Sequence, residues 1–192
     1  MCSSDLFYPS VLGMLLLMIC FFIFPTNFSA VCVKTTNLDP IAVTVIMVAL
    51  DVVAALVGVV FGGMMRLFRL SVKYFAPIFF LLGYLCFATS PSLPSLLVGC
   101  LFIGIANGIG VPYLNTIASI KAGQDAATTV MPLLSAALYA GQFLSPLVAT
   151  PLAAKFFPDN LSGIYWIACA FSILFLLEAF ATRRFQSLPP KE

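Results

Sequence analysis

Asp51 is a carboxylate in the middle of a long apolar stretch, where few residues can do chemistry. It lies ten residues after Ile41, which at 1.5 Å per residue is about 15 Å deep, close to the midplane of a membrane. An ionisable side chain at that depth indicates a functional site, either a proton carrier or a counter-charge to a substrate. Two structural alternatives stay open: a buried carboxyl that remains protonated, or one that is hydrogen bonded to a neighbour such as Asn27 or Gln142.

Other chemistry is excluded by the residue types that are missing. The chain has no histidine, which removes Ser-His and Cys-His nucleophile pairs and any His-ligated metal. The six cysteines have no metal-like spacing and are interpreted as small apolar packing residues. There is no phosphate loop, and aspartyl chemistry would need a second intramembrane Asp beside Asp51. We therefore expect no enzymatic activity, no metal and no cofactor, and the net charge of +2 is too small to suggest a nucleic-acid partner.

The composition predicts a polytopic membrane protein, an all-α bundle of six transmembrane helices. Of the 192 residues, 62% are hydrophobic and 8% are charged, whereas a soluble domain has about 45–50% and about 25%. Long apolar stretches, each able to cross a bilayer of about 30 Å, occupy about residues 11–33, 41–65, 74–89, 94–119, 127–154 and 163–182. The short links between them predict that consecutive helices are antiparallel neighbours in one domain over 7–184, followed by a cytoplasmic tail at 185–192.

The positive charges predict the orientation. With the N-terminus inside, the cytoplasmic loops and tail hold seven of the nine basic residues: Arg66, Arg69, Lys73, Lys121, Arg183, Arg184 and Lys191. The outside loops then hold only Lys34 and Lys155. Because positively charged loops stay in the cytoplasm, we expect both termini there, with the protein in the cell membrane.

The first six residues, Met1-Cys-Ser-Ser-Asp-Leu6, differ in character from the apolar stretch that begins near residue 11. They lack the basic region and cleavage site of a signal peptide. They match the translated end of a widely used sequencing adapter, with a GTG start read as Met. We therefore expect residues 1–6 to be an assembly artefact and the gene to continue upstream; a genuine short cytoplasmic tail is the alternative.

Polar residues are concentrated in four of the six stretches. The candidates for lining a cavity are Asp51, Asn27, Asn107, Tyr113, Asn115, Tyr139 and Gln142. Since polar groups are costly in hydrocarbon, the first, second, fourth and fifth stretches are expected to surround a wet cavity. The third and sixth stretches are almost wholly apolar until Glu178 and are expected to face lipid. Snorkelling and pairing with Arg183 and Arg184 account for Glu178.

Small residues at four-residue spacing predict close helix contacts in three stretches. These series are Ala54, Gly58 and Gly62; Gly104 and Gly108; and Ala137, Gly141, Ser145, Ala149 and Ala153. Glycine and proline also occur together at mid-depth, which gives the hinge candidates Gly108, Gly110, Pro112, Gly141 and Pro146. Bending and static kinks both fit this pattern.

This arrangement resembles the C-terminal half of a major facilitator superfamily transporter, helices seven to twelve of that fold. The segment from Gly58 to Arg69 is similar to the family's second copy of the Gly…Asp-Arg-x-Gly-Arg signature between helices eight and nine. Gly62, Arg66 and Arg69 are the candidate residues of this loop signature, but only Arg66 and Arg69 carry over. The leading glycine is off by one, and Met65 and Phe68 stand where Asp and Gly would be. The segment from Gly141 to Pro146 is typical of helix eleven.

The resemblance implies secondary active transport of a small solute by alternating access, with proton-coupled efflux as one form of it. The implied partners are a small-molecule solute, the lipid bilayer and a missing N-terminal six-helix half of the same protein. Two alternatives stay open: a half-transporter that forms homodimers, and a six-helix membrane scaffold.

Overall fold

The computed structural model describes residues 8–36, 38–90 and 92–182, without the side chains of residues 70 and 123–127. The expectations for residues 1–6 and for the tail at 185–192 lie outside the described residues, as does the pairing of Glu178 with Arg183 and Arg184. Every regular element in the described part is helical: α1 (Tyr8–Thr36), α2 (Pro40–Phe68), the 3-10 turn η2 (Arg69–Ser71), α3 (Val72–Thr89), α4 (Leu93–Phe156) and α5 (Gly163–Ala181).

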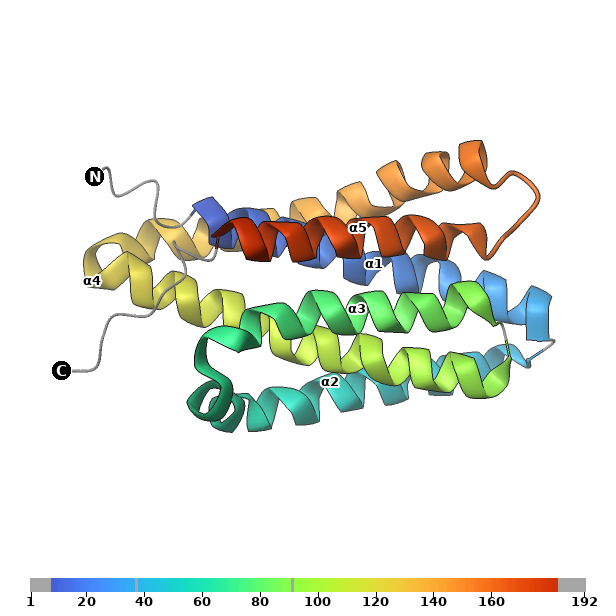
Figure 1. Cartoon of the computed structure of the whole chain (residues 1–192), viewed down its shortest axis with the longest axis horizontal. Helices are drawn as coiled ribbons and strands as arrows, with labels where there is room; N and C mark the ends of the chain where they lie inside the picture. Colours follow the sequence, from blue (N-terminus) through green and yellow to red (C-terminus); the bar gives the residue numbers. More distant parts are fainter. Residues whose placement is uncertain (1–7, 37, 91, 183–192) are drawn as a thin grey trace.

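Among the residues that the structure describes, six helical segments are long and apolar enough to span a membrane, as the apolar stretches predict. Two of them, Leu93–Ala122 and Thr128–Phe156, belong to the single 64-residue helix α4. Figure 1 shows α4 reaching one end of the bundle and then returning along it. The link expected between the fourth and fifth apolar stretches lies where these two spans separate, after Ala122 and before Thr128, although helical structure continues through it. Lys121, Ala122 and Gln124 are good helix formers and favour that continuity, whereas Gly123 disfavours it.

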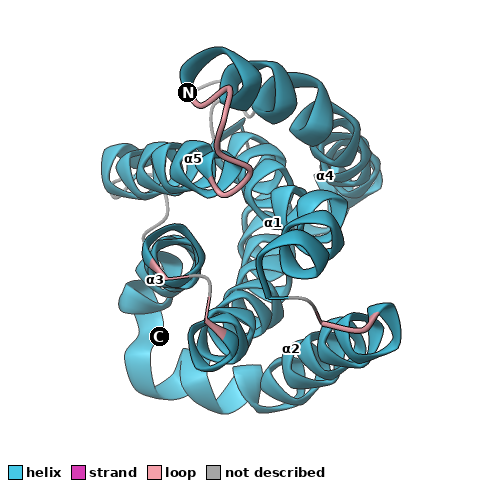
Figure 2. Ribbon diagram, turned by 90° about the vertical axis from the view of Figure 1, so that its right-hand side faces the viewer, coloured by secondary structure: helices cyan, strands magenta, loops and turns pink. Residues whose placement is uncertain are grey.

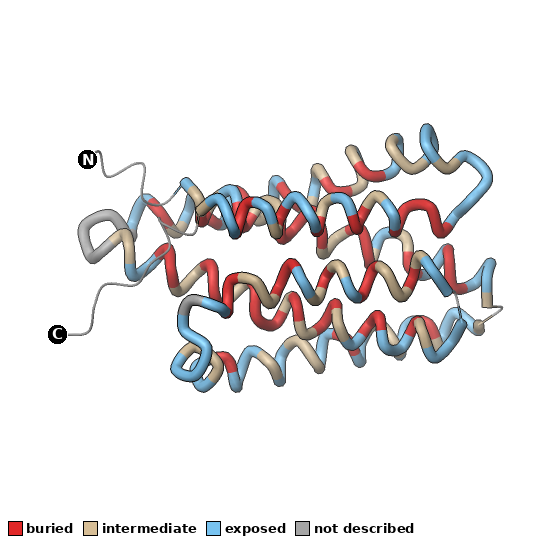
Figure 3. Tube along the Cα trace, viewed as in Figure 1, coloured by how far each residue is buried: buried red, intermediate tan, exposed pale blue. Residues whose placement is uncertain are grey.

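The helices do not all pack on their neighbours in sequence. α1 runs through the middle of the bundle (Figure 2) and packs on α4 and α5, whereas α3 lies between α4 and α5. α2 packs chiefly on the first half of α4 and has little contact with α1 or α3. The expectation that consecutive helices are neighbours is thus wrong for α2. α2 is also the least buried span (Figure 3). In its most apolar 18 residues 11% are buried, whereas in each of the other five spans at least 28% of the corresponding residues are buried.

An aromatic core joins the third and sixth spans to the first. The rings of Phe24 and Phe28 from α1 contact Phe87 from α3, with centroids 5.8 and 5.6 Å apart. Tyr165 from α5 packs on Phe87 at 5.0 Å and stacks on Tyr84 at 6.1 Å. These contacts bury one face of α3 and one face of α5. They also stabilise the bundle, because aromatic pairs contribute energy beyond the area that they bury.

The small-residue series place two helix contacts where the spacing predicts them. Gly104 and Gly108 face α2: a Cβ on Gly104 would lie 2.9 Å from the Leu50 carbonyl oxygen, and one on Gly108 would meet the Ala54 carbonyl oxygen. Gly62, by contrast, has open space around it. Without a hydrophobic force between helices in lipid, such backbone approach is what holds α2 to α4.

The second contact joins α1 to the returning half of α4. A Cβ on Gly141 would lie 2.6 Å from Met18 Cβ, so only glycine fits without movement. One turn on, the buried Ser145 Oγ donates a 2.9 Å hydrogen bond to the Ile19 carbonyl oxygen.

The charges are divided between the two ends of the bundle. α1 begins and α5 ends at the end where α2 passes into α3 and where α4 turns back (Figure 1). Arg66, Arg69, Lys73 and Lys121 belong to the elements at this end, whereas Lys34 and Lys155 lie in the last turns of α1 and α4 at the other. The fold thus keeps the basic residues of the expected inside loops together; the side that faces the cytoplasm stays a prediction.

Candidate functional site

Asp51 lies in a groove between α1 and α2. The groove encloses about 170 Å³ and is lined by Phe21, Phe22, Phe24, Pro25, Met47, Leu50 and Asp51. Asp51 is exposed and makes no hydrogen bond or ion pair to any residue that the structure describes. It is therefore not bonded to Asn27, whose Nδ2 donates to the Ile23 carbonyl oxygen at 2.9 Å and to Thr26 Oγ1 at 2.8 Å.

Pro25 shapes the α1 wall of this groove. Proline has no N–H, so the carbonyl of Phe21, four residues earlier, lacks its helical donor. The next carbonyl, from Phe22, accepts a 2.7 Å hydrogen bond from Thr26 Oγ1. The groove thus combines the Asp51 carboxylate, a hydrogen-bond acceptor, with three phenylalanine residues. Acceptors beside ring faces suit a solute that carries N–H groups or a positive charge.

The other predicted cavity residues do not gather around Asp51. Asn27 lines a second cavity of about 190 Å³ with Thr150 and Asn160. Tyr139 is 67% exposed on the returning half of α4. Asn107, Asn115 and Gln142 are half-buried. Asn107 Oδ1 is buried without a hydrogen-bond partner among the described residues.

Tyr113 points into the bundle and not toward the groove. It is 4% exposed and lines a small cavity with Lys73 and Glu178. Sequence reasoning misses this cluster, because it assigns Lys73 to a loop and Glu178 to pairing with residues after the helix. The available signal is that both charges fall in terminal turns of apolar helices, where packing against a neighbour can bury them.

The hinge candidates are packing positions inside continuous helix. A Cβ on Gly110 would clash with the Leu17 side chain, and Gly108 and Gly141 are equally crowded. Pro112 and Pro146 lie within α4 without ending it. Whether these positions bend during a functional cycle stays a prediction.

The loop signature lies at the surface. Gly62, Arg66 and Arg69 are all exposed. Arg69 has a φ of 44° where α2 passes into η2, a conformation that glycine adopts more readily. The strained residue thus follows Phe68, the position at which the family signature has glycine.

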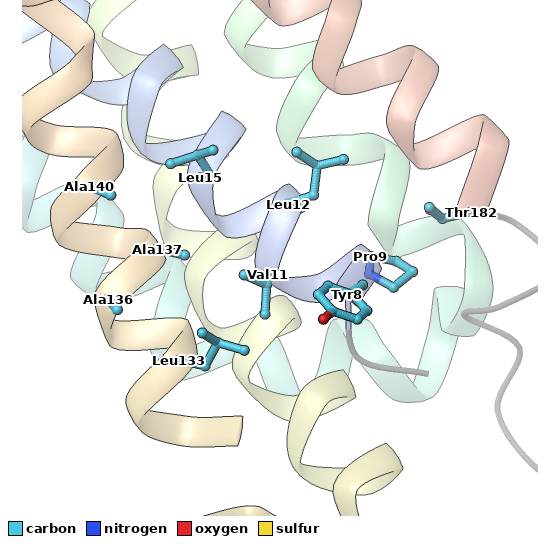
Figure 4. A pocket seen from close by; sticks show the side chains of 10 residues that line it. All are labelled: Tyr8, Pro9, Val11, Leu12, Leu15, Leu133, Ala136, Ala137, Ala140 and Thr182. Atoms are coloured by element: carbon cyan, nitrogen blue, oxygen red, sulfur yellow. The ribbon is translucent and has the colours of Figure 1, made fainter. Parts of the chain in front are cut away.

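A larger cavity than the Asp51 groove lies elsewhere and is almost wholly apolar. It encloses about 900 Å³ between the start of α1 and the returning half of α4, with Leu12, Leu15, Leu133 and Ala140 among its walls (Figure 4). None of the described residues that line it is charged. Size alone therefore does not mark the site, and the Asp51 groove is the better candidate because it holds an ionisable group.

The length and apolarity of the six helical segments define a multi-pass membrane protein. Comparison with protein-family models, curated proteins and solved structures finds no match to this chain. The major facilitator likeness therefore rests on the residues and the helix pattern.

Proposed function

We propose that this chain is the C-terminal half of a secondary transporter similar to the major facilitator superfamily, which moves a small solute across the membrane by alternating access. The observation that carries the proposal is Asp51, an exposed carboxylate about halfway along the span with no partner among the described residues. At the centre of a bilayer an aspartate costs about 2.5–3.5 kcal/mol, so this side of α2 is expected to face water or protein.

The groove also supports the class of solute. Phe21 and Phe22 offer apolar ring surface beside the carboxylate, an arrangement that favours a lipophilic cation over an anion. A membrane scaffold has no need for an ionisable group at this depth. A homodimer of the chain would cover α2 equally well, and reconstitution separates it from a full-length transporter.

The test is transport by the full-length gene product in proteoliposomes. The probes are tetraphenylphosphonium, a lipophilic cation, and tetraphenylborate, an anion of similar size. Both ions cross lipid unaided, so uptake is counted only where it exceeds that of protein-free liposomes. We expect Asp51→Asn to lower cation uptake about tenfold, equivalent to about 1.4 kcal/mol. Asp39→Asn is the matched control, because Asp39 is an exposed carboxylate at the start of the same helix.

The outcomes distinguish the alternatives. Unchanged cation uptake by Asp51→Asn would show that Asp51 has no role in transport. If neither probe nor a wider solute panel moved under any gradient, the transporter proposal would be wrong. Uptake by the 192-residue chain alone, with crosslinked dimers, would favour the homodimer.

A further inference from the structure

A second ionisable cluster lies inside the bundle, apart from the Asp51 groove. Lys73 of α3, Tyr113 of α4 and Glu178 of α5 line one small cavity, and their exposed fractions are 4%, 4% and 8%. A charged residue buried to this degree is rare unless it has a specific role or partner. Three helices thus bring a base, a phenol and an acid together at one place.

α1 closes the cluster from the fourth side. Gly13 has no side chain, and a Cβ there would lie 3.6 Å from Glu178 Oε2, so the α1 backbone passes close to the carboxylate. Ser10, one turn earlier, is 1% exposed. Ser10 Oγ and Glu178 Oε1 are both buried without a hydrogen-bond partner among the described residues.

The groups that face Glu178 limit how its charge is balanced. From α3 it meets Lys73, whose ammonium lies 4.9 Å from the centroid of the Tyr74 ring. From α4 it meets Tyr113, and from α1 the uncharged Gly13 lies beside it. In the described part of the chain, Lys73 is therefore the one cation that can offset a Glu178 carboxylate.

We propose that Glu178 is a proton-binding site. Its carboxylate takes up one proton from the water at this end of the bundle and forms an O–H bond. Lys73 remains an ammonium, so the formal charge of the pair changes from zero to +1. Glu178 lies in the last turn of α5, which gives the proton a short path from the aqueous phase.

Proton uptake would change the packing of four helices. While Glu178 is ionised, its attraction to Lys73 holds the end of α5 against the start of α3, beside α1 and α4. Neutralising the carboxyl removes that attraction, and with it one interaction that keeps these helix ends together. Such a change can couple proton binding to helix movement. The claim that Glu178 couples proton binding to transport rests on the proposed function. The claim that it binds a proton does not.

The experiment is a pH titration of the full chain in lipid nanodiscs, followed by difference infrared spectroscopy of the protonated-carboxyl C=O band. We expect, between about pH 5 and about pH 9, a titrating band that is missing in Glu178→Gln and kept in Asp51→Asn. A spectrum without a Glu178-dependent band in this range would overturn the proposal.

A second variant keeps the test decisive if Glu178→Gln fails to fold. Lys73→Met removes the neighbouring cation and should move the midpoint of the band to higher pH by about one unit or more. Lys155→Met, an exposed lysine at the opposite end of the bundle, is the control and should leave the midpoint unchanged. Equal midpoints in both lysine variants would also overturn the proposal.

Transport then tests the coupling separately. In proteoliposomes of the full-length protein, Glu178→Gln should retain exchange of tetraphenylphosphonium at equal pH on both sides. The stimulation of uptake by a pH gradient should fall at least about tenfold. An unchanged response would refute the coupling. Absence of any flux in the wild-type protein would refute the proposed function and leave the infrared result standing.

Discussion

Replacing Gly141 by alanine should loosen the contact between α1 and the returning half of α4. The added Cβ would lie 2.6 Å from Met18 Cβ and 2.7 Å from the Leu15 carbonyl oxygen, closer than real Cβ atoms approach. Both obstacles belong to or adjoin the α1 backbone, so the helices must separate. Overpacking of this kind costs about 1–3 kcal/mol, and the better helix propensity of alanine returns about 0.5–1 kcal/mol. The expected net loss is about 1–2 kcal/mol, a factor of about 5–30 in the unfolding equilibrium.

The assay is reversible unfolding by SDS in mixed micelles, with the fluorescence of Trp166 as the probe, since the chain has a single tryptophan. Gly62→Ala is the matched control because Gly62 is exposed and a Cβ there would meet nothing within 4 Å. We expect this control to be neutral or slightly stabilising. The reasoning fails if Gly141→Ala is as stable as the wild type, or if the control loses as much.

Two further substitutions test other contacts by the same unfolding assay. Ser145→Ala removes the buried hydrogen bond to α1 and should lower the free energy of unfolding by about 0.6 kcal/mol, and by about 1.7 kcal/mol at most. Ser135→Ala is the control and should cost less, because the exposed Ser135 hydroxyl bonds within its own helix. Equal losses in the two variants would contradict this prediction. Arg69→Gly should stabilise the chain by about 1 kcal/mol, because glycine adopts the φ of 44° without strain; a lower stability would show that the backbone there is not strained.

The spans and their contact stripes could be predicted because both depend on local composition. An apolar stretch of about 20 residues must cross the bilayer, and small residues at four-residue spacing must lie on one helix face. Gly104 and Gly108 therefore meet another helix in the structure. The spacing does not name the partner, and the choice of α2 depends on the assembled bundle.

The burial of Lys73 and Glu178 could not be predicted, because it too depends on how the helices assemble. Each lies in a terminal turn, where a charged side chain normally reaches water. Their burial requires that α3, α4 and α5 meet at one end with Gly13 of α1 beside them, a meeting of segments far apart in sequence. The sequence predicts Tyr113 in a cavity with Asn115, and its inward direction depends on the same long-range packing.

The packing of α2 on α4 has a consequence for synthesis of the chain in the cell. Gly108 comes 54 positions after Ala54, the residue that it packs on, so at about 5–20 residues per second it is made roughly 3–11 s later. Throughout that interval α2 must stay in the membrane by its own apolarity, although Asp51 opposes insertion by about 3 kcal/mol. Its eight valines, two isoleucines and three leucines supply about 4–8 kcal/mol in favour of insertion. The valine-rich composition of α2 therefore keeps this helix inserted in lipid, despite its charged residue, until its partner α4 has been translated.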